Sequence, residues 1–168
     1  MPFTPSSSGP HDLALRNGSV VLPDGTANVT LYVRDGLVSA IGGEAPAERT
    51  IDCTGLTILP GVIDTQVHFR EPGAEENEDL ATGSRAAVLG GVTGVFEMPN
   101  TKPTTSTPEA VADKLARAQG RMWCEHAFYV GATSDNADEC GALEQLPGTA
   151  GIKVFMGSST GSLLVSED

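Results

Sequence analysis

Basic residues are scarce in this chain: ten lysines and arginines stand against 22 aspartates and glutamates, and the formal net charge is −12. A surface this acidic repels nucleic-acid backbones and anionic membranes. Nonspecific binding to either is therefore excluded as a function. A single well-placed arginine can still bind a small anion locally, so an anionic substrate stays compatible with this composition.

Cysteine is also scarce. Cys53, Cys124 and Cys140 are odd in number and lack metal-type spacing, which predicts reduced thiols in the cytoplasm and excludes a disulfide framework. No apolar run is long enough to span a membrane. Residues 1–11 lack the apolar core of a signal peptide, and we expect a disordered leader there, with no role for His11.

Short alternating runs separated by glycine-containing turns fill residues 12–59. Asn17-Gly18, Asp24-Gly25 and Asp35-Gly36 lie between such runs, and these dipeptides are strong hairpin signals. The segment carries no cluster of catalytic residue types. We predict a small antiparallel sheet.

The pattern changes to alternating strands and helices over residues 60–168. Helix-like segments occupy residues 79–89, 108–119 and 136–146. Because parallel strands need a crossover of a dozen or more residues, normally a helix, this pattern predicts an α/β fold with a parallel sheet. The four apolar runs begin at a constant interval of 30 residues, at Val62, Val92, Met122 and Ile152.

The length of this repeat bears on the architecture. Eight units of this size need about 240 residues, close to the roughly 250 typical of a (β/α)8 barrel. Residues 60–168 hold four units, and the chain stops at Asp168 without a helix after the fourth strand. A small open sheet and half a barrel both fit, and the abrupt end favours half a barrel.

The most informative stretch, LPGVIDTQVHFREPG, occupies residues 59–73. It starts as a buried strand and becomes polar only at its carboxyl end, where parallel sheets carry their chemistry. The alternative is a structural histidine beside a surface pair of Arg70 and Glu71. Strand alternation predicts four polar side chains on one face: Asp64, Gln66, His68 and Arg70.

Candidate groups also follow the later strands. Asn100 comes after the second strand and is either a turn residue or a substrate-binding amide. His126 comes early in the third strand, which is the stability end of a barrel, so we expect a structural role.

Lys153 is the one charged residue in the apolar run 151–156. A buried ammonium must shift its pKa, pair or be modified, unless it reaches solvent at the strand end. Counted from the starts of the apolar runs, Lys153 comes one residue into its run and His68 comes six residues into its own. The 30-residue spacing alone therefore does not place the two residues at one site. The segment 157–161 resembles a phosphate-binding loop only weakly.

With DTQVHFREPG, EMPNT and GIKVFMGSSTG in this order, the chain resembles the dihydroorotases of the amidohydrolase superfamily from about Asp12 to its end. The resemblance implies the first half, four βα units, of a metal-dependent (β/α)8 TIM-type barrel in residues 60–168. Part of a small β-sandwich domain in residues 12–59 would precede it. It also implies zinc bound by His68 and by Lys153 as a carbamate, and a substrate carboxylate bound by Arg70 and Asn100.

The implied reaction is the reversible conversion of dihydroorotate to N-carbamoyl-L-aspartate, in pyrimidine biosynthesis. Gln66 stands where the family has the first of two histidines, and an amide is a poor zinc ligand. The site would therefore hold one or two zinc ions. The family's remaining ligands and catalytic aspartate lie on later strands, so we expect the 168 residues alone to be inactive.

Two alternative functions remain open. A catalytically silent dihydroorotase-like subunit that scaffolds aspartate carbamoyltransferase would explain Gln66, but it would need neither His68 nor Lys153. A hydantoinase or allantoinase would share the metal residues, whereas Arg70 and Asn100 favour an anionic ring. A homodimer is the other assembly we consider.

Overall fold

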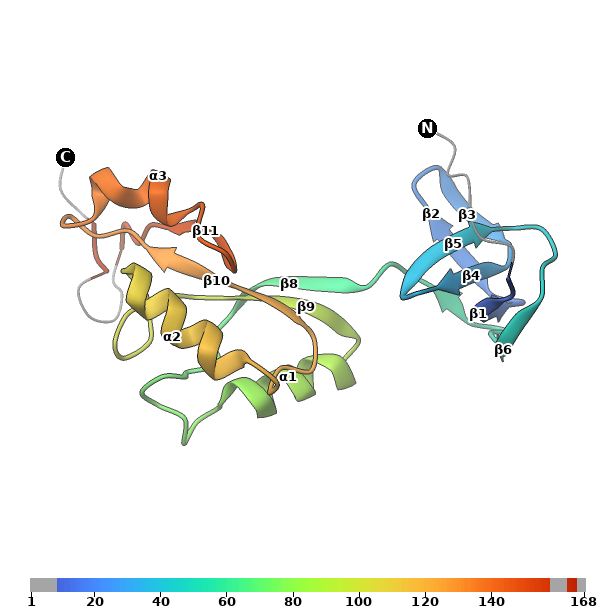
Figure 1. Cartoon of the computed structure of the whole chain (residues 1–168), viewed down its shortest axis with the longest axis horizontal. Helices are drawn as coiled ribbons and strands as arrows, with labels where there is room; N and C mark the ends of the chain where they lie inside the picture. Colours follow the sequence, from blue (N-terminus) through green and yellow to red (C-terminus); the bar gives the residue numbers. More distant parts are fainter. Residues whose placement is uncertain (1–8, 158–162, 166–168) are drawn as a thin grey trace. The chain divides into compact units, whose positions relative to one another are not determined.

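The computed structural model describes residues 9–157 and 163–165 and forms two compact units, Met1–Pro60 and Gly61–Asp168 (Figure 1). The predicted leader, apart from residues 9–11, and most of the loop 157–161 lie outside the described residues. No helix in the described ranges is both long enough and apolar enough to cross a membrane.

The first unit contains two small sheets of mixed direction. The central strand of one, β1, pairs antiparallel with β4 and parallel with β6, and in the other β2 pairs antiparallel with β3 and parallel with β7. The predicted single antiparallel sheet is therefore wrong, because β1 and β2 enter different sheets and Asn17-Gly18 links them without forming a hairpin. The strands are β1 (His11–Arg16), β2 (Ser19–Leu22), β3 (Gly25–Asn28), β4 (Leu31–Arg34), β5 (Leu37–Ile41), β6 (Ala47–Asp52) and β7 (Thr57–Ile58).

The hairpin predicted at Asp35-Gly36 is confirmed. These residues connect β4 to β5 and have φ angles of 52° and 74°. Two successive positive φ angles match the twist of the flanking strands, and Asp-Gly accepts them readily.

His11 is the first residue of β1, so its assignment to a disordered leader is wrong. The ring is buried, with Nδ1 2.8 Å from Ser39 Oγ and its centroid 4.6 Å from that of Tyr32. These contacts come from β4 and β5, which the local sequence around His11 does not reveal.

The second unit is a parallel sheet in the order β11-β10-β9-β8, and the α/β prediction is confirmed. Its strands are β8 (Val62–Val67), β9 (Val92–Glu97), β10 (Glu125–Gly131) and β11 (Thr149–Lys153). Its helices are α1 (Leu80–Leu89), α2 (Pro108–Ala118), the 3₁₀ turn η1 (Ala137–Glu139) and α3 (Cys140–Leu143).

The constant interval of 30 residues is correct for β8 and β9 and wrong for the two later strands. Met122 and Cys124 pack against the hydrophobic core before β10 begins at Glu125. β11 begins at Thr149, three residues before Ile152. A connecting segment whose apolar side chains pack on the core has the same sequence pattern as the start of a strand.

Local signals set the helix boundaries well for α1 and α2. Asp79 caps α1 and forms a reciprocal capping box with Thr82, and Thr107 caps α2 just before Pro108. The third predicted helix is shorter than expected. Before it, the Asn136 amide donates to the carbonyls of Ser106 and Gly131, and its oxygen accepts from Thr133 N–H.

Helices α1 and α2 pack together on the central strands β9 and β10 (Figure 1). A core cluster of Phe69, Leu80, Val95, Ala118 and Phe128 fills the space between the helices and the sheet. On the opposite face the rings of Phe96 and Tyr129 meet edge to face at 6.2 Å. The sheet therefore has one helix-covered face and one that these helices leave uncovered. The half barrel itself stays a prediction.

Candidate functional site

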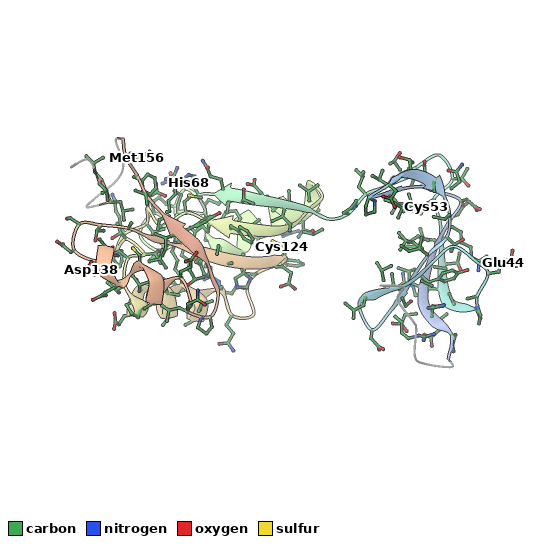
Figure 2. All side chains as sticks on the ribbon, turned by 90° about the horizontal axis from the view of Figure 1, so that it is seen from above. Glu44, Cys53, His68, Cys124, Asp138 and Met156 are labelled. Atoms are coloured by element: carbon green, nitrogen blue, oxygen red, sulfur yellow. The ribbon has the colours of Figure 1, made fainter. Side chains whose placement is uncertain are left out.

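The predicted site residues gather at the carboxyl-terminal edge of the parallel sheet. His68 directly follows β8, Asn100 comes three residues after β9, and Lys153 is the last residue of β11. Figure 2 shows His68 at the end of β8. The structure thus brings Lys153 and His68 to the same edge, which the apolar runs alone did not, because β11 begins at Thr149. They remain on the two outer strands of the sheet.

A hydrogen bond joins the loops that follow β8 and β9. His68 Nδ1 lies 2.9 Å from Asn100 Oδ1. An amide oxygen can only accept, so the ring nitrogen donates, and Nδ1 carries the hydrogen. In the neutral ring the lone pair is then on Nε2, which leaves that nitrogen able to bind a metal.

The alternation predicted for β8 is interrupted by a β-bulge. Asp64 lies opposite Val95 and Val67 lies opposite Glu97, so three steps along β8 match two along β9. Asp64 is therefore aligned with the helix-covered face and does not share the face of His68, contrary to the prediction. The Asp64 carboxylate accepts the backbone N–H of Gln66 at 2.9 Å, which stabilises the bulge. Gln66 and His68 flank Val67 and lie on the other face.

Arg70 does not reach the site by strand alternation. β8 ends at Val67, and Arg70 has a φ of 61°, in the left-handed region. For a residue with a Cβ this conformation costs about 1–2 kcal/mol and persists only where its surroundings impose it. The Arg70 side chain is exposed.

A pocket of about 490 Å³ lies beside these strand-end loops, and both predicted carboxylate-binding residues line it. Lys102, which the sequence analysis overlooked, adds a second cationic side chain. Two basic residues at one pocket favour a small anion locally, although the chain as a whole is acidic. The lining residues are Arg70, Pro72, Gly73, Ala74, Asn77, Asn100, Thr101 and Lys102.

The two loops that form the pocket also bond through their backbones. The N–H of Lys102 donates to the Pro72 carbonyl at 2.9 Å. A Cβ on Gly73 would collide with the backbone of Lys102, so this close approach requires glycine, whose φ is 101°.

Glu71 does not form the surface pair with Arg70 that the sequence allowed. It is 3% exposed, and Arg121 donates to both of its carboxylate oxygens, at 2.7 and 2.9 Å. The backbone N–H of Leu80 donates to one of them at 3.1 Å. Burial alone would raise the pKa of Glu71, but the hydrogen bonds from Arg121 and Leu80 and the charges of Arg121 and Arg117 lower it below its ordinary value. Nothing in the spacing reveals a partner 50 residues away.

A fully buried ion pair lies at the end of β9, three residues before Asn100 in the chain. Lys114 Nζ of α2 is 2.6 Å from Glu97 Oε2 at the end of β9, and both side chains are almost fully buried. The same ammonium donates to the Met98 carbonyl at 3.2 Å. Burial raises the pKa of Glu97 and lowers that of Lys114, against their mutual attraction. The pair fixes the backbone just before Pro99 and Asn100.

Lys153 and His126 lie at opposite edges of the sheet. Lys153 is half-buried and pairs in register with Gly131, and its Nζ is 5.3 Å from the centroid of the Phe155 ring. His126 is the second residue of β10, and its ring lies 5.7 Å from that of Phe128. His126 therefore lies away from the candidate site.

The described residues contain no group of three or more His, Cys, Asp and Glu side chains that could hold a metal. The donors at the sheet edge are His68, Gln66 and Lys153, from β8 and β11. A zinc site needs three or four protein ligands. This donor set fits a metal only in part, with His68 in the appropriate tautomer.

The chain is similar to known proteins over most of its length. The family described as Dihydro-orotase-like matches residues 55–149. An allantoinase of Solibacter usitatus (strain Ellin6076) is 40% identical over 150 residues, which are 88% of this chain and 33% of the relative. An allantoinase of Escherichia coli O1:K1 / APEC is 35% identical over 147 residues, 86% of this chain and 32% of the relative.

Among solved structures, the L-hydantoinase (dihydropyrimidinase) from Arthrobacter aurescens aligns with a TM-score of 0.83 at 31% identity, covering 94% of this chain and 36% of the hydantoinase. The chain thus spans about a third of the length of these relatives, which are cyclic amidohydrolases. With more than half of its residues matched, the chain belongs to the Dihydro-orotase-like family of the amidohydrolase superfamily.

Proposed function

We propose that this chain forms the amino-terminal part of a dihydroorotase, in which its pocket binds the carboxylate of dihydroorotate. The observation that carries the proposal is the presence of Arg70, Asn100 and Lys102 around one pocket at the carboxyl ends of β8 and β9. In the proposed reaction, water adds to the ring amide, its C–N bond breaks, and N-carbamoyl-L-aspartate forms.

The polar groups of the pocket suit a carboxylate. The Arg70 guanidinium can donate two parallel hydrogen bonds to the two carboxylate oxygens. The Asn100 oxygen is engaged by His68, which leaves the Asn100 NH₂ free to donate to the substrate. Asn100 would then hold both the substrate and the imidazole.

The sheet supports a barrel that extends beyond this chain. Four parallel strands in sequence order with helices on one face are what the first half of a (β/α)8 barrel would contain. In that barrel His68 would follow the first strand and Lys153 would end the fourth. On a flat sheet three strand spacings of about 4.8 Å would separate them. Curvature of a closed barrel would turn both side chains toward its axis.

We further propose that the barrel holds zinc, with His68 as one ligand and Lys153, carboxylated on Nζ, as another. Zinc would polarise the amide carbonyl of the ring. The residues of this chain position that ring: Arg70 and Asn100 hold its carboxylate, and Asn100 orients His68. The remaining ligands and the catalytic base would come from strands beyond this chain.

An allantoinase is the second candidate, favoured by the 40% identity to the Solibacter relative. Allantoin carries no carboxylate and has no use for a charged fork at Arg70. The two candidates therefore differ in whether the pocket must neutralise a substrate carboxylate.

Turnover by the full-length protein distinguishes them. We would measure kcat/KM for dihydroorotate, N-carbamoyl-L-aspartate, allantoin and hydantoin with added zinc. Preference for the first two by tenfold or more supports the proposal, and preference for allantoin or hydantoin rejects it. Absence of all four activities, with stable binding to aspartate carbamoyltransferase, would show the scaffold function instead.

A further inference from the structure

Arg70 lies between two buried side chains. Phe69 packs with Leu80, Val95 and Phe128 in the core under α1, and a Cβ on Gly83 would collide with its ring. On the other side the Glu71 carboxylate is held by two hydrogen bonds from Arg121 and one from Leu80 N–H. Both neighbours are directed into the helix layer, while Arg70 itself is exposed.

These anchors come from three different elements. Phe69 and Glu71 bring the strand-end loop onto the first turn of α1, and Arg121 lies just after α2. Arg117 adds a longer contact to Glu71 at 3.7 Å. A rotation of the loop about Arg70, whose φ is 61°, would break at least one of these contacts.

We propose that Glu71 is a positioning residue that acts through Arg121: the pair holds the backbone at Arg70 in its left-handed conformation and thereby directs the guanidinium into the pocket. This inference rests on the proposed function, in which Arg70 binds the substrate carboxylate. Arg121 donates from the helix side and belongs to this anchor; it does not line the pocket.

The test uses full-length protein with Glu71→Gln, Arg121→Lys and Arg121→Met. Gln keeps an acceptor for Leu80 N–H and loses the charge-assisted fork, whereas Lys retains one donor and Met retains none. We expect KM for dihydroorotate to rise about tenfold in Glu71→Gln, with kcat within about twofold, since misplacing a binding group by an ångström is costly. Arg121→Lys should be affected less than Arg121→Met.

The matched control is Glu109→Gln, which neutralises an exposed carboxylate in the first turn of α2. It should leave both constants unchanged. A lower melting temperature in Glu71→Gln with unaltered KM would overturn the inference and make the pair purely structural. An equal loss in kcat and kcat/KM with unaltered KM would also overturn it.

A crystal structure of Glu71→Gln tests the inference independently of activity. We expect φ at Arg70 to leave the left-handed region or the guanidinium to leave the pocket. An unmoved Arg70 would overturn the inference, whatever the enzyme's substrate. Failure of wild-type protein to turn over dihydroorotate would instead reject the proposed function, and the two failures are thus distinguished.

Discussion

His68 and Asn100 are 32 residues apart in the sequence, and a hydrogen bond of 2.9 Å joins His68 Nδ1 to Asn100 Oδ1. The bond connects two neighbouring strand ends and selects one tautomer of the imidazole. It also occupies the oxygen of the Asn100 amide, which leaves the NH₂ group available to a substrate. Asn100 is therefore both a candidate substrate contact and a support for a candidate metal ligand.

Replacing Asn100 by alanine should weaken zinc binding by full-length protein about 10- to 100-fold, the usual effect of removing the partner that orients a ligating histidine. Competition with a chelator would measure the affinity. Asn77→Ala is the matched control, because Asn77 lines the same pocket and does not contact His68. Equal zinc affinity in wild type and Asn100→Ala would contradict the supporting role.

Arg70→Lys should lower kcat/KM for dihydroorotate in full-length protein, because an ammonium loses one bond of the guanidinium fork. The expected decrease corresponds to a loss of roughly 1–3 kcal/mol of transition-state stabilisation. Steady-state kinetics would measure it. The control is Arg85→Lys on α1, where the Arg85 guanidinium lies 5.8 Å from the centroid of the Trp123 ring. Unchanged kinetics in Arg70→Lys would reject the assignment of Arg70 to the carboxylate.

Gln66 should limit the site to one firmly held metal, since an amide oxygen competes poorly with imidazole for zinc. Metal analysis of full-length protein should give about one zinc per chain, and Gln66→His should raise that content. If the unmodified protein retained two zinc ions through dialysis, Gln66 would not impair the site.

Lys153 should be carboxylated in full-length zinc protein and a free amine after zinc is stripped. A carbamate replaces a half-buried cation by an anionic oxygen ligand and helps to neutralise the metal. Carbon-13 NMR after labelling with bicarbonate would detect the carbamate without any assay of turnover. A crystal structure of the zinc protein with a bare Lys153 directed away from the metal would refute this prediction.

Lys114→Met should lower the free energy of unfolding by about 3–5 kcal/mol, because it leaves the buried Glu97 carboxylate without its partner. Urea denaturation would measure the loss. The double variant Glu97→Leu/Lys114→Met removes both charges and should recover most of the stability. If the double variant lost as much free energy of unfolding as Lys114→Met, the unpaired Glu97 carboxylate would not be the cause of the loss.

The sequence alone determined the features that depend on local patterning. Alternating strand-like and helix-like segments predicted the α/β unit, and the helix-like segments 79–89 and 108–119 agree closely with α1 and α2, whose N-caps are Asp79 and Thr107. The apolar-to-polar change along β8 identified the strand end that carries His68. These features follow from contacts within a few residues, so sequence spacing reports them directly.

Only the tertiary structure decided which of these residues meet. The bulge in β8 separates Asp64 from the face of His68, and the left-handed Arg70 leaves the strand altogether. Glu71 pairs with Arg121 rather than with its neighbour, and Lys153 is the final residue of its strand. Such contacts join residues 30 to 50 positions apart through strand register and helix packing, and no local period encodes them.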